Sequence, residues 1–476
     1  MKQIGDEYFD SKEFRNILDS YEASVGTGHP IFMDVDDLAD IADYYNMVGK
    51  KEKAIQTADL ALDLNPGATL PLVFKARQAL DAGDIETARR LAGQIISRED
   101  PEYTLIEAEI MIAEQRPQQA DEYLTTYFEN LPDEEKDDCV LDITALYLDY
   151  GEYKLADKWK KRARDRRRKD IRDMSGRVDF ALGDFDKSLE TFRQLVDEEP
   201  YNKRYWYACA NNHFMKDELN ETLDCVDFGI AIDPEDPDCL LLKANVLFKK
   251  NSYKEAVRYY ERYLSEVPAD ASVKLNIGVC CINLQQYDLA IDYLHDALNL
   301  TGDDEFTRFS VLQEMAFAYS AMKMPGLAMA CINEADKLPC DHADMKVLKG
   351  HIYLENNEPQ KAQKMFQQAV AESDNSPRIV LRVILSLYDN EYLDICFKLL
   401  RHFLKTSGKD CDEGYAYMAL CCWEMKKDSE FLTYLELIVK RNADMARTVL
   451  GHLFPEGMQP ADYHQYMYNK LNHNEK

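Results

Sequence analysis

The chain has 476 residues, with 87 acidic and 57 basic side chains and a formal net charge of −30. Attraction to phosphate backbones and anionic lipid depends on an excess of Lys and Arg, so this charge argues against non-specific nucleic-acid and membrane binding. The first residues, MKQIGDEYFD, contain acids where a signal peptide needs an apolar stretch, and no apolar run is long enough to span a bilayer; we therefore expect a cytoplasmic protein.

The start of the chain predicts one capping helix within residues 1–34. Residues 12–24 place Phe14 and Tyr21 on one face of a helix, and the sequence VGTGHP, with Gly28 and Pro30, ends it. A lone amphipathic helix suits the end of a stack, where a polar face must replace the missing neighbour.

A period of 34 residues then governs the middle of the chain. Pro200, Pro234 and Pro268 each close a stretch that carries small residues 24 and 12 positions earlier. A period of this length predicts helix-turn-helix units that bury their apolar faces only by stacking. About ten units begin near residues 35, 69, 101, 137, 169, 203, 237, 271, 309 and 343.

Two departures from the period concern the C-terminal part. The register slips by four residues between Glu305 and Arg308, after TGDD, and we expect a longer loop there. After residue 376 the small residues lose their spacing of 12, so residues 377–442 are interpreted as degenerate helical pairs and residues 443–476 as closing helices and tail.

The repeated pattern resembles that of the tetratricopeptide repeat (TPR) family over roughly residues 35–376. The seventh unit, with Leu240, Ala244, Ala256, Tyr260 and Pro268, is among the closest matches. The resemblance implies an all-α fold, a right-handed superhelical solenoid of antiparallel helix pairs with helical caps at both ends. The chain resembles stand-alone bacterial TPR arrays of unassigned function. This resemblance implies a non-enzymatic scaffold that binds a protein or peptide segment.

The sequence predicts no cofactor, no metal site and no catalytic centre. Phosphate-binding, dinucleotide-binding, hydrolase and zinc-protease motifs are absent. The tightest thiol and imidazole grouping, Cys331, Cys340, His342 and His351, fits no common zinc spacing. Adjacent cysteines within helical patterns indicate small buried hydrophobic residues. An enzyme would need a polar cluster that converges only in three dimensions.

The segment from Lys158 to Arg172 is the most unusual local feature, with ten basic and two acidic residues. One interpretation is a solvated helix end and turn whose cations pair with neighbouring carboxylates. The other is a docking patch for an acidic partner segment or for RNA, because guanidinium groups bind carboxylate and phosphate bidentately. The candidate patch consists of Lys160, Lys161, Arg162, Arg164, Arg166, Arg167, Arg168 and Lys169.

The family resemblance also implies a groove lined by the first helix of each unit. Asn211 and Asn245 occupy the same place in successive units, and Asn side chains can grip a peptide backbone because they both donate and accept hydrogen bonds. Ordinary polar residues on a solvated face are the alternative. The candidate groove residues are Arg177, Arg204, Tyr207, Asn211, Asn245 and Asn276.

A TPR subclass grips the C-terminal carboxylate of chaperones through Lys, Arg and Asn residues. Asn245 and Asn276 resemble its two Asn positions, but Leu241, Ser310 and Glu314 stand where the cations belong. The sequence therefore argues against a carboxylate clamp. The leading hypothesis is a protein or peptide partner, the alternative is RNA or another polyanion bound through residues 158–172, and the oligomeric state stays open.

Overall fold

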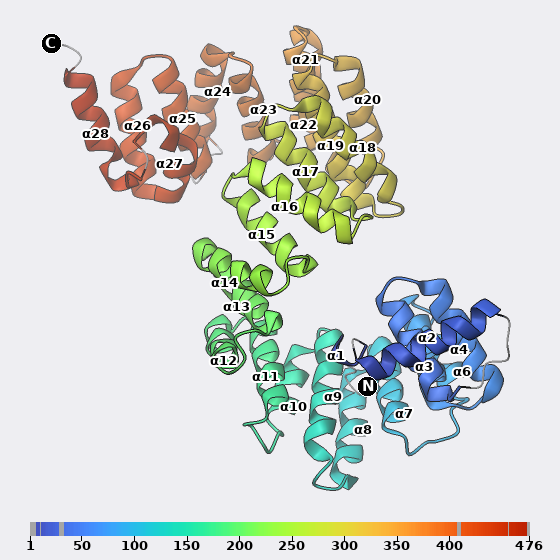
Figure 1. Ribbon diagram of the computed structural model, residues 1–476. Helices are drawn as coiled ribbons and strands as arrows, with labels where there is room; N and C mark the ends of the chain where they lie inside the picture. The colour runs from blue at the N-terminus through green and yellow to red at the C-terminus, as the bar shows by residue number, and fades with distance from the viewer. Residues whose placement is uncertain (1–5, 10, 28–32, 407–410, 456, 474–476) are drawn as a thin grey trace. The chain divides into compact units, whose positions relative to one another are not determined.

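The computed structural model describes residues 6–9, 11–27, 33–406, 411–455 and 457–473, and these residues form helices with no strand among them (Figure 1). This confirms the predicted all-α class. The residues divide into two compact halves, with the boundary between Cys239 and Leu240. Within the described residues, no helix has both the length and the apolarity that a membrane span requires.

The N-terminal half begins with the short helix α1 and the capping helix α2, and then consists of packed helix pairs. The helices are α1 (Asp6–Phe9), α2 (Lys12–Thr27), α3 (Val35–Met47), α4 (Lys51–Leu64), α5 (Thr69–Asp81), α6 (Ile85–Ala92), α7 (Pro101–Ala113), α8 (Pro117–Asn130), α9 (Lys136–Asp149), α10 (Tyr153–Lys160), α11 (Lys169–Ala181), α12 (Phe185–Glu198), α13 (Lys203–Met215) and α14 (Leu219–Ile232).

The C-terminal half continues the same arrangement, and helix α15 contains the boundary between the halves. The helices are α15 (Pro237–Lys249), α16 (Tyr253–Glu266), α17 (Ala271–Asn283), α18 (Tyr287–Leu300), α19 (Glu305–Ala321), α20 (Pro325–Ala335), α21 (His342–Glu355), α22 (Pro359–Glu372), α23 (Pro377–Asp389), α24 (Leu393–Thr406), α25 (Asp412–Glu424), α26 (Asp428–Arg441), α27 (Ala443–Leu450), the 3₁₀ turn η1 (Gly451–Leu453) and α28 (Pro460–His473).

Small residues 12 positions apart let the two helices of a pair approach closely. Ala42 and Ala54, which face each other in the pair α3 and α4, are fully buried. In later pairs the contact is tighter. A Cβ atom on Gly350 of α21 would lie 2.3 Å from the ring of Phe366 in α22. Since that separation is far below van der Waals contact, only glycine fits at this crossing.

The turn between the two helices of each pair contains one residue with a left-handed backbone. Glycine holds this position in several early pairs, including Gly49 with φ of 74°. Later pairs use other residues, such as Asn251, Asn357 and Glu391. Each turn closes with a hydrogen bond from the residue directly after the left-handed one to the last turn of the first helix, as from Lys50 N–H to the Tyr45 carbonyl at 2.8 Å.

The same turn persists where the small-residue spacing is lost. Glu391 joins α23 to α24 and Lys426 joins α25 to α26, both with positive φ. The Lys427 N–H donates to the Cys422 carbonyl at 2.9 Å, which repeats the closing hydrogen bond of the earlier turns. The pairs α23–α24 and α25–α26 therefore keep the backbone of a helix pair although their packing residues differ.

The predicted longer loop at the four-residue slip is wrong. Helix α19 begins at Glu305 and runs for 17 residues, so the extra residues add a helical turn at its start. The carboxylate of Asp304 accepts the N–H groups of Phe306 and Thr307, both at 3.1 Å, and this cap starts the helix early.

Both ends of the array are closed by helices. At the N-terminus, Phe14 of α2 is fully buried, and the hydroxyl of Tyr21 hydrogen bonds to that of Thr57 at 2.9 Å. Gly28 and Pro30, which we expect to end this helix, lie outside the described residues. At the C-terminus, the ring of Phe454 stacks on that of Tyr463 in α28, with 3.7 Å between centroids.

Candidate functional site

A groove of 560 Å³ lies in the N-terminal half, and we call it the N-terminal groove. All its lining residues come from the first helices of five successive pairs, α3, α5, α7, α9 and α11, including the residue that caps α9. Its volume falls within the range typical of binding sites for small ligands and peptide side chains.

One position in each first helix supplies a wall residue. It directly follows the small residue that packs against the second helix, and because successive helical residues are turned by about 100°, it faces the side rather than the pair's interior. Its occupants are Asp43, Arg77, Glu109, Ala145 and Arg177, which follow Ala42, Ala76, Ala108, Thr144 and Gly176.

Arg77 of α5 connects its helix to α7 through an ion-pair network. Its Nε and Nη2 groups donate to Glu109 Oε1 at 3.0 and 2.7 Å. Nε also donates to Glu109 Oε2 at 3.2 Å, and Nη2 to Glu102 Oε2 at 3.3 Å. Burial acts to lower the pKa of Arg77, but the carboxylates of Glu109 and Glu102 outweigh it and hold the pKa above its usual value. Glu109 itself is buried, so this network is a fixed part of the wall.

Two other carboxyl groups of the groove have no such partner. Asp43 of α3 and Asp142 of α9 are half-buried, and no hydrogen bond or ion pair engages either side chain within the described residues. Burial is the main cause that raises the pKa of each to about 6. Burial also raises the pKa of Asp149, the last residue of α9.

The predicted groove residues are distributed over both halves. Arg177 lines the N-terminal groove and pairs with Asp173 at 2.8 Å. Arg204, Tyr207 and Asn211 lie on α13, where Tyr207 and Asn211 hydrogen bond to each other and Arg204 is exposed. None of these three lines the N-terminal groove.

Asn245 and Asn276 belong to the C-terminal half, on α15 and α17. The buried hydroxyl of Tyr260 donates to Asn245 Oδ1 at 2.7 Å, and Asn276 also hydrogen bonds to Tyr260. Both amides are thus partly used for packing within this half. A shared groove for all six residues stays a prediction.

The sequence signal for the N-terminal groove was available but only partly used. Asn211 is 34 residues after Arg177, which we included among the candidates. The same position in earlier pairs leads to Glu109, Arg77 and Asp43, which sequence reasoning missed because it followed amides rather than the position itself. Asp142 lies three residues before that position, on the same helical face.

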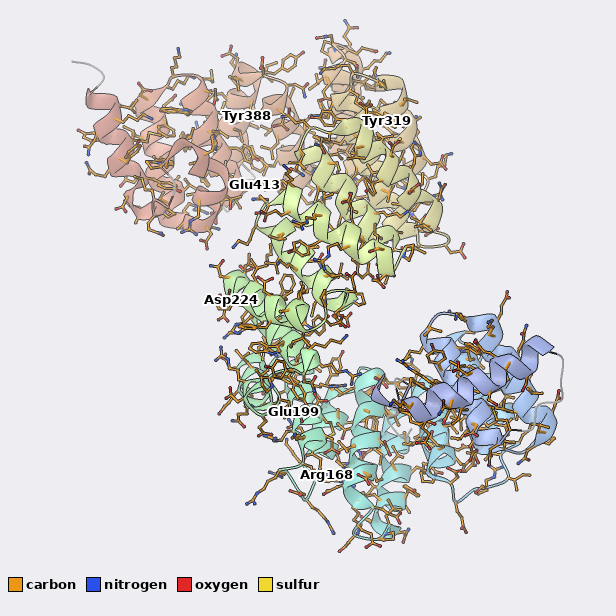
Figure 2. The ribbon with its side chains drawn as sticks, in the orientation of Figure 1. Arg168, Glu199, Asp224, Tyr319, Tyr388 and Glu413 are labelled. Atoms are coloured by element: carbon orange, nitrogen blue, oxygen red, sulfur yellow. The ribbon has the colours of Figure 1, made fainter. Side chains whose placement is uncertain are left out.

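The basic segment 158–172 covers the end of α10, the connection 161–168 and the first turn of α11. Most of its cations face carboxylates of the same half. Lys160 pairs with Asp179 at 2.5 Å, and Arg168 lies 2.7 Å from Asp138 and 2.5 Å from Asp170. Figure 2 shows Arg168 at this connection and Glu199, the partner of Lys169, nearby.

The remaining cations of the segment differ in their surroundings. Lys161 pairs with Asp157 and Arg164 with Asp133, at 2.5 and 2.9 Å. The Arg162 guanidinium covers the Trp159 ring, 4.1 Å from its centroid. Arg166 and Arg167 are exposed and form no ion pair among the described residues. A docking role for the segment stays a prediction, and Arg166 and Arg167 are the side chains that we expect to contact a partner.

The predicted thiol and imidazole grouping is only partly assembled. The Nδ1 atom of His342 lies 2.8 Å from Asp336 Oδ1 and 3.7 Å from Cys340 Sγ, whereas Cys331 and His351 lie outside this cluster. Lys349 already pairs with the other oxygen of Asp336 at 2.7 Å. That ammonium group competes directly with any cation that the three residues would bind.

A second cavity, of 470 Å³, lies beside α12 and α14 around the buried His213. Glu218 is 2.6 Å from His213 Nδ1, and the Arg193 guanidinium is 3.3 Å from Nε2. Because guanidinium only donates hydrogen bonds, this geometry fits a neutral imidazole that accepts at Nε2 and donates at Nδ1. Both ring nitrogens are thus occupied. The lining of this cavity contains no serine, threonine or cysteine.

Two segments of the chain match models of the tetratricopeptide repeat, residues 241–305 and residues 343–375. Among curated proteins, the chain is similar to BBSome complex member BBS4 of Bos taurus, with 31% identity over 90 residues, 19% of this chain and 17% of that protein. It is also similar to Tetratricopeptide repeat protein 21B of Mus musculus, with 22% identity over 278 residues, 56% of this chain and 20% of that protein. The chain thus spans at most a fifth of the length of these two relatives.

Two solved structures are among those that match this chain. YrrB, described as a TPR protein with an unusual peptide-binding site, has 23% identity and a TM-score of 0.36, with 43% of this chain and 99% of that chain covered. Yeast Tom70 has 15% identity and a TM-score of 0.42, with 92% and 96% covered.

Proposed function

Because this chain is a tetratricopeptide-repeat protein, we propose that it is a non-enzymatic scaffold that binds a peptide or protein segment in a groove lined by its first helices. The observation that carries the proposal is the N-terminal groove, to which five successive repeats contribute wall residues. Such a site presents one side chain per repeat at regular intervals, an arrangement suited to an elongated ligand. A cytoplasmic location is part of this proposal.

The groove combines apolar and polar walls. Phe74, Leu105 and Leu146 contribute largely buried apolar surface, and Arg77 and Gln78 contribute hydrogen-bonding groups. Binding sites typically join a predominantly apolar lining with a few placed polar groups, which fix the orientation of the ligand.

A peptide-display selection on the purified chain tests the proposal. Ala145 lines the groove on α9, so Ala145→Trp would fill it, whereas Ala231→Trp places the same bulk on an exposed position of the second helix α14. We expect selected peptides to lose binding to Ala145→Trp and to keep it with Ala231→Trp. Selected peptides that bind both variants equally, or a selection that enriches none, would contradict the proposal.

The alternative function, polyanion binding through residues 158–172, rests on the exposure of Arg166 and Arg167. Filter binding of single-stranded RNA at low salt tests it. Retention of RNA by the wild type, lost in Arg166→Glu/Arg167→Glu, would support this function. No retention at low salt would exclude it, because counterion release makes such binding strongest there.

A further inference from the structure

The charges of the N-terminal groove are unequally compensated. Five carboxylates and two guanidinium groups line it. Arg77 is occupied by Glu109 and Glu102, and Arg177 pairs with Asp173. Both cations of the lining are therefore already paired within the protein, and the other carboxylates of the groove form no ion pair among the described residues.

Four aspartates make up this uncompensated set, and they come from three helices. Asp43 lies on α3, Asp81 at the end of α5, and Asp142 and Asp149 on α9. No ion pair engages any of them among the described residues. Asp43 and Asp142 are also half-buried, and a charge removed from water without a partner costs free energy.

The arrangement distinguishes between kinds of ligand. A carboxylate-lined groove repels nucleic acid and anionic lipid. A metal ion needs ligand atoms that nearly touch, and the described residues gather three such groups only at Asp336, Cys340 and His342, in the other half. The groove carboxylates are thus too dispersed for a cation cage, whereas separate Lys or Arg side chains on one chain can reach them individually.

The apolar part of the lining adds a second requirement. Phe74, Leu105 and Leu146 are each less than a tenth exposed, and Leu80, Leu148 and Tyr150 are half-buried around them. A ligand that only carried charge would leave this surface in contact with water. A segment with both basic and apolar side chains would pair with the carboxylates and also cover the apolar surface of the groove.

We propose that the N-terminal groove binds a basic segment of a partner protein, with Lys or Arg side chains placed at Asp43 and Asp142 and apolar side chains against Phe74 and Leu105. This inference rests on the proposed function and specifies the chemistry of its partner. The ammonium or guanidinium groups of the segment take the place that Arg77 holds for Glu109, but from outside the chain.

Short synthetic peptides of one length, in which alternate Leu residues are separated by Lys, Gln or Glu, provide the test by fluorescence anisotropy. We expect the Lys peptide to bind the wild type at least about tenfold more tightly than the Gln peptide, the Glu peptide not to bind, and added salt to weaken the Lys complex. Equal binding of the Lys and Gln peptides, or tighter binding of the Glu peptide, would overturn the inference.

Matched variants test whether the preference for the Lys peptide comes from the aspartates of the N-terminal groove. Asp43→Asn/Asp142→Asn removes two groove charges, whereas Asp63→Asn/Asp224→Asn removes two exposed charges from the second helices α4 and α14 (Figure 2 labels Asp224). The first pair should weaken the Lys peptide by about tenfold or more and the second by less than about twofold. Equal losses would mean general attraction to an acidic protein and would overturn the inference.

The result also separates this inference from the proposed function. If Lys and Gln peptides bind equally and Ala145→Trp abolishes both, the groove binds peptides without a basic preference, so the function stands and the inference fails. If no peptide binds the wild type, both fail. The peptide series needs no variant, so it decides the question even where a substitution perturbs folding.

Discussion

Single residues set how closely the helices of a pair approach, and Gly350 is the tightest such position of the array. An added Cβ would overlap the ring of Phe366, which is itself buried. We expect Gly350→Ala to lower the free energy of unfolding by about 1–3 kcal/mol, because the ring or the backbone must move.

Gly326→Ala is the control, since its helix α20 lies in the same half and no atom stands within 4 Å of the added Cβ. Alanine favours helix over glycine, so this variant should be neutral or up to about 1 kcal/mol more stable. Urea unfolding followed by circular dichroism measures both. Equal changes in the two variants would show that overlap with Phe366 is not the cause.

Asp43 and Asp142 make stability depend on pH. Their pKa in the folded protein is about 6, above the ordinary 3.8, so the folded chain holds these protons more tightly than the unfolded chain. Their contribution is fully present below pH 3.8 and is lost as pH rises through 6. The charged groups that act on Asp43 are Arg77, Asp40 and Glu102, and those that act on Asp142 are Glu102, Asp138 and Arg77.

The difference between the wild type and Asp43→Asn/Asp142→Asn isolates this effect from the other carboxylates. Relative to the variant, the wild type should lose on the order of 1–3 kcal/mol of stability between about pH 4 and pH 7, less where solvent screens the groove. Thermal unfolding across this range measures the difference. A constant difference would contradict the raised pKa values.

At the scale of the element, capping residues decide where helices begin. Asp270 accepts the Val273 N–H at 3.0 Å at the start of α17, and the Tyr263 hydroxyl of α16 donates to its other oxygen at 3.0 Å. Asp270→Ala removes both hydrogen bonds and should cost about 1–2 kcal/mol. Asp270→Asn keeps an accepting oxygen at the cap and should lose less, as urea unfolding can determine.

Much of the element order could be predicted from the sequence, because small residues 12 apart mark the crossings of the helix pairs up to residue 376. The expectation of a longer loop at Glu305 was wrong because it also rested on periodicity. The Asp304 cap and the following FTRF sequence form helix as readily as loop, and periodicity alone cannot choose between an inserted turn of helix and a longer connection.

The candidate site was less accessible to sequence reasoning. Arg177 could be placed because family geometry points its position to the groove, but the pairing that uses up Arg77 and Arg177 depends on residues about 30 positions away or one turn along the helix. The unpaired state of Asp43 and Asp142 follows from what surrounds them in space. A chain with 87 acidic residues gives no reason to single out two of them.

At the scale of the whole molecule, repeats contact mainly their neighbours in sequence, so a local defect should stay local. Hydrogen exchange tests this with Gly350→Ala. We expect faster exchange in α21, α22 and the adjoining helices, and unchanged exchange in α7 and α9 of the N-terminal half. Uniformly faster exchange along the chain would indicate a single cooperative unit instead.

The N-terminal groove has a further consequence for how such a chain can diverge. In each first helix, the residue that packs the repeat and the residue that faces the groove are adjacent in sequence, as Ala76 and Arg77 are. Selection can therefore change the groove-facing residue without disturbing the packing residue. A descendant of this protein could acquire a different partner through a few codon changes at one periodic position while it inherits the same scaffold.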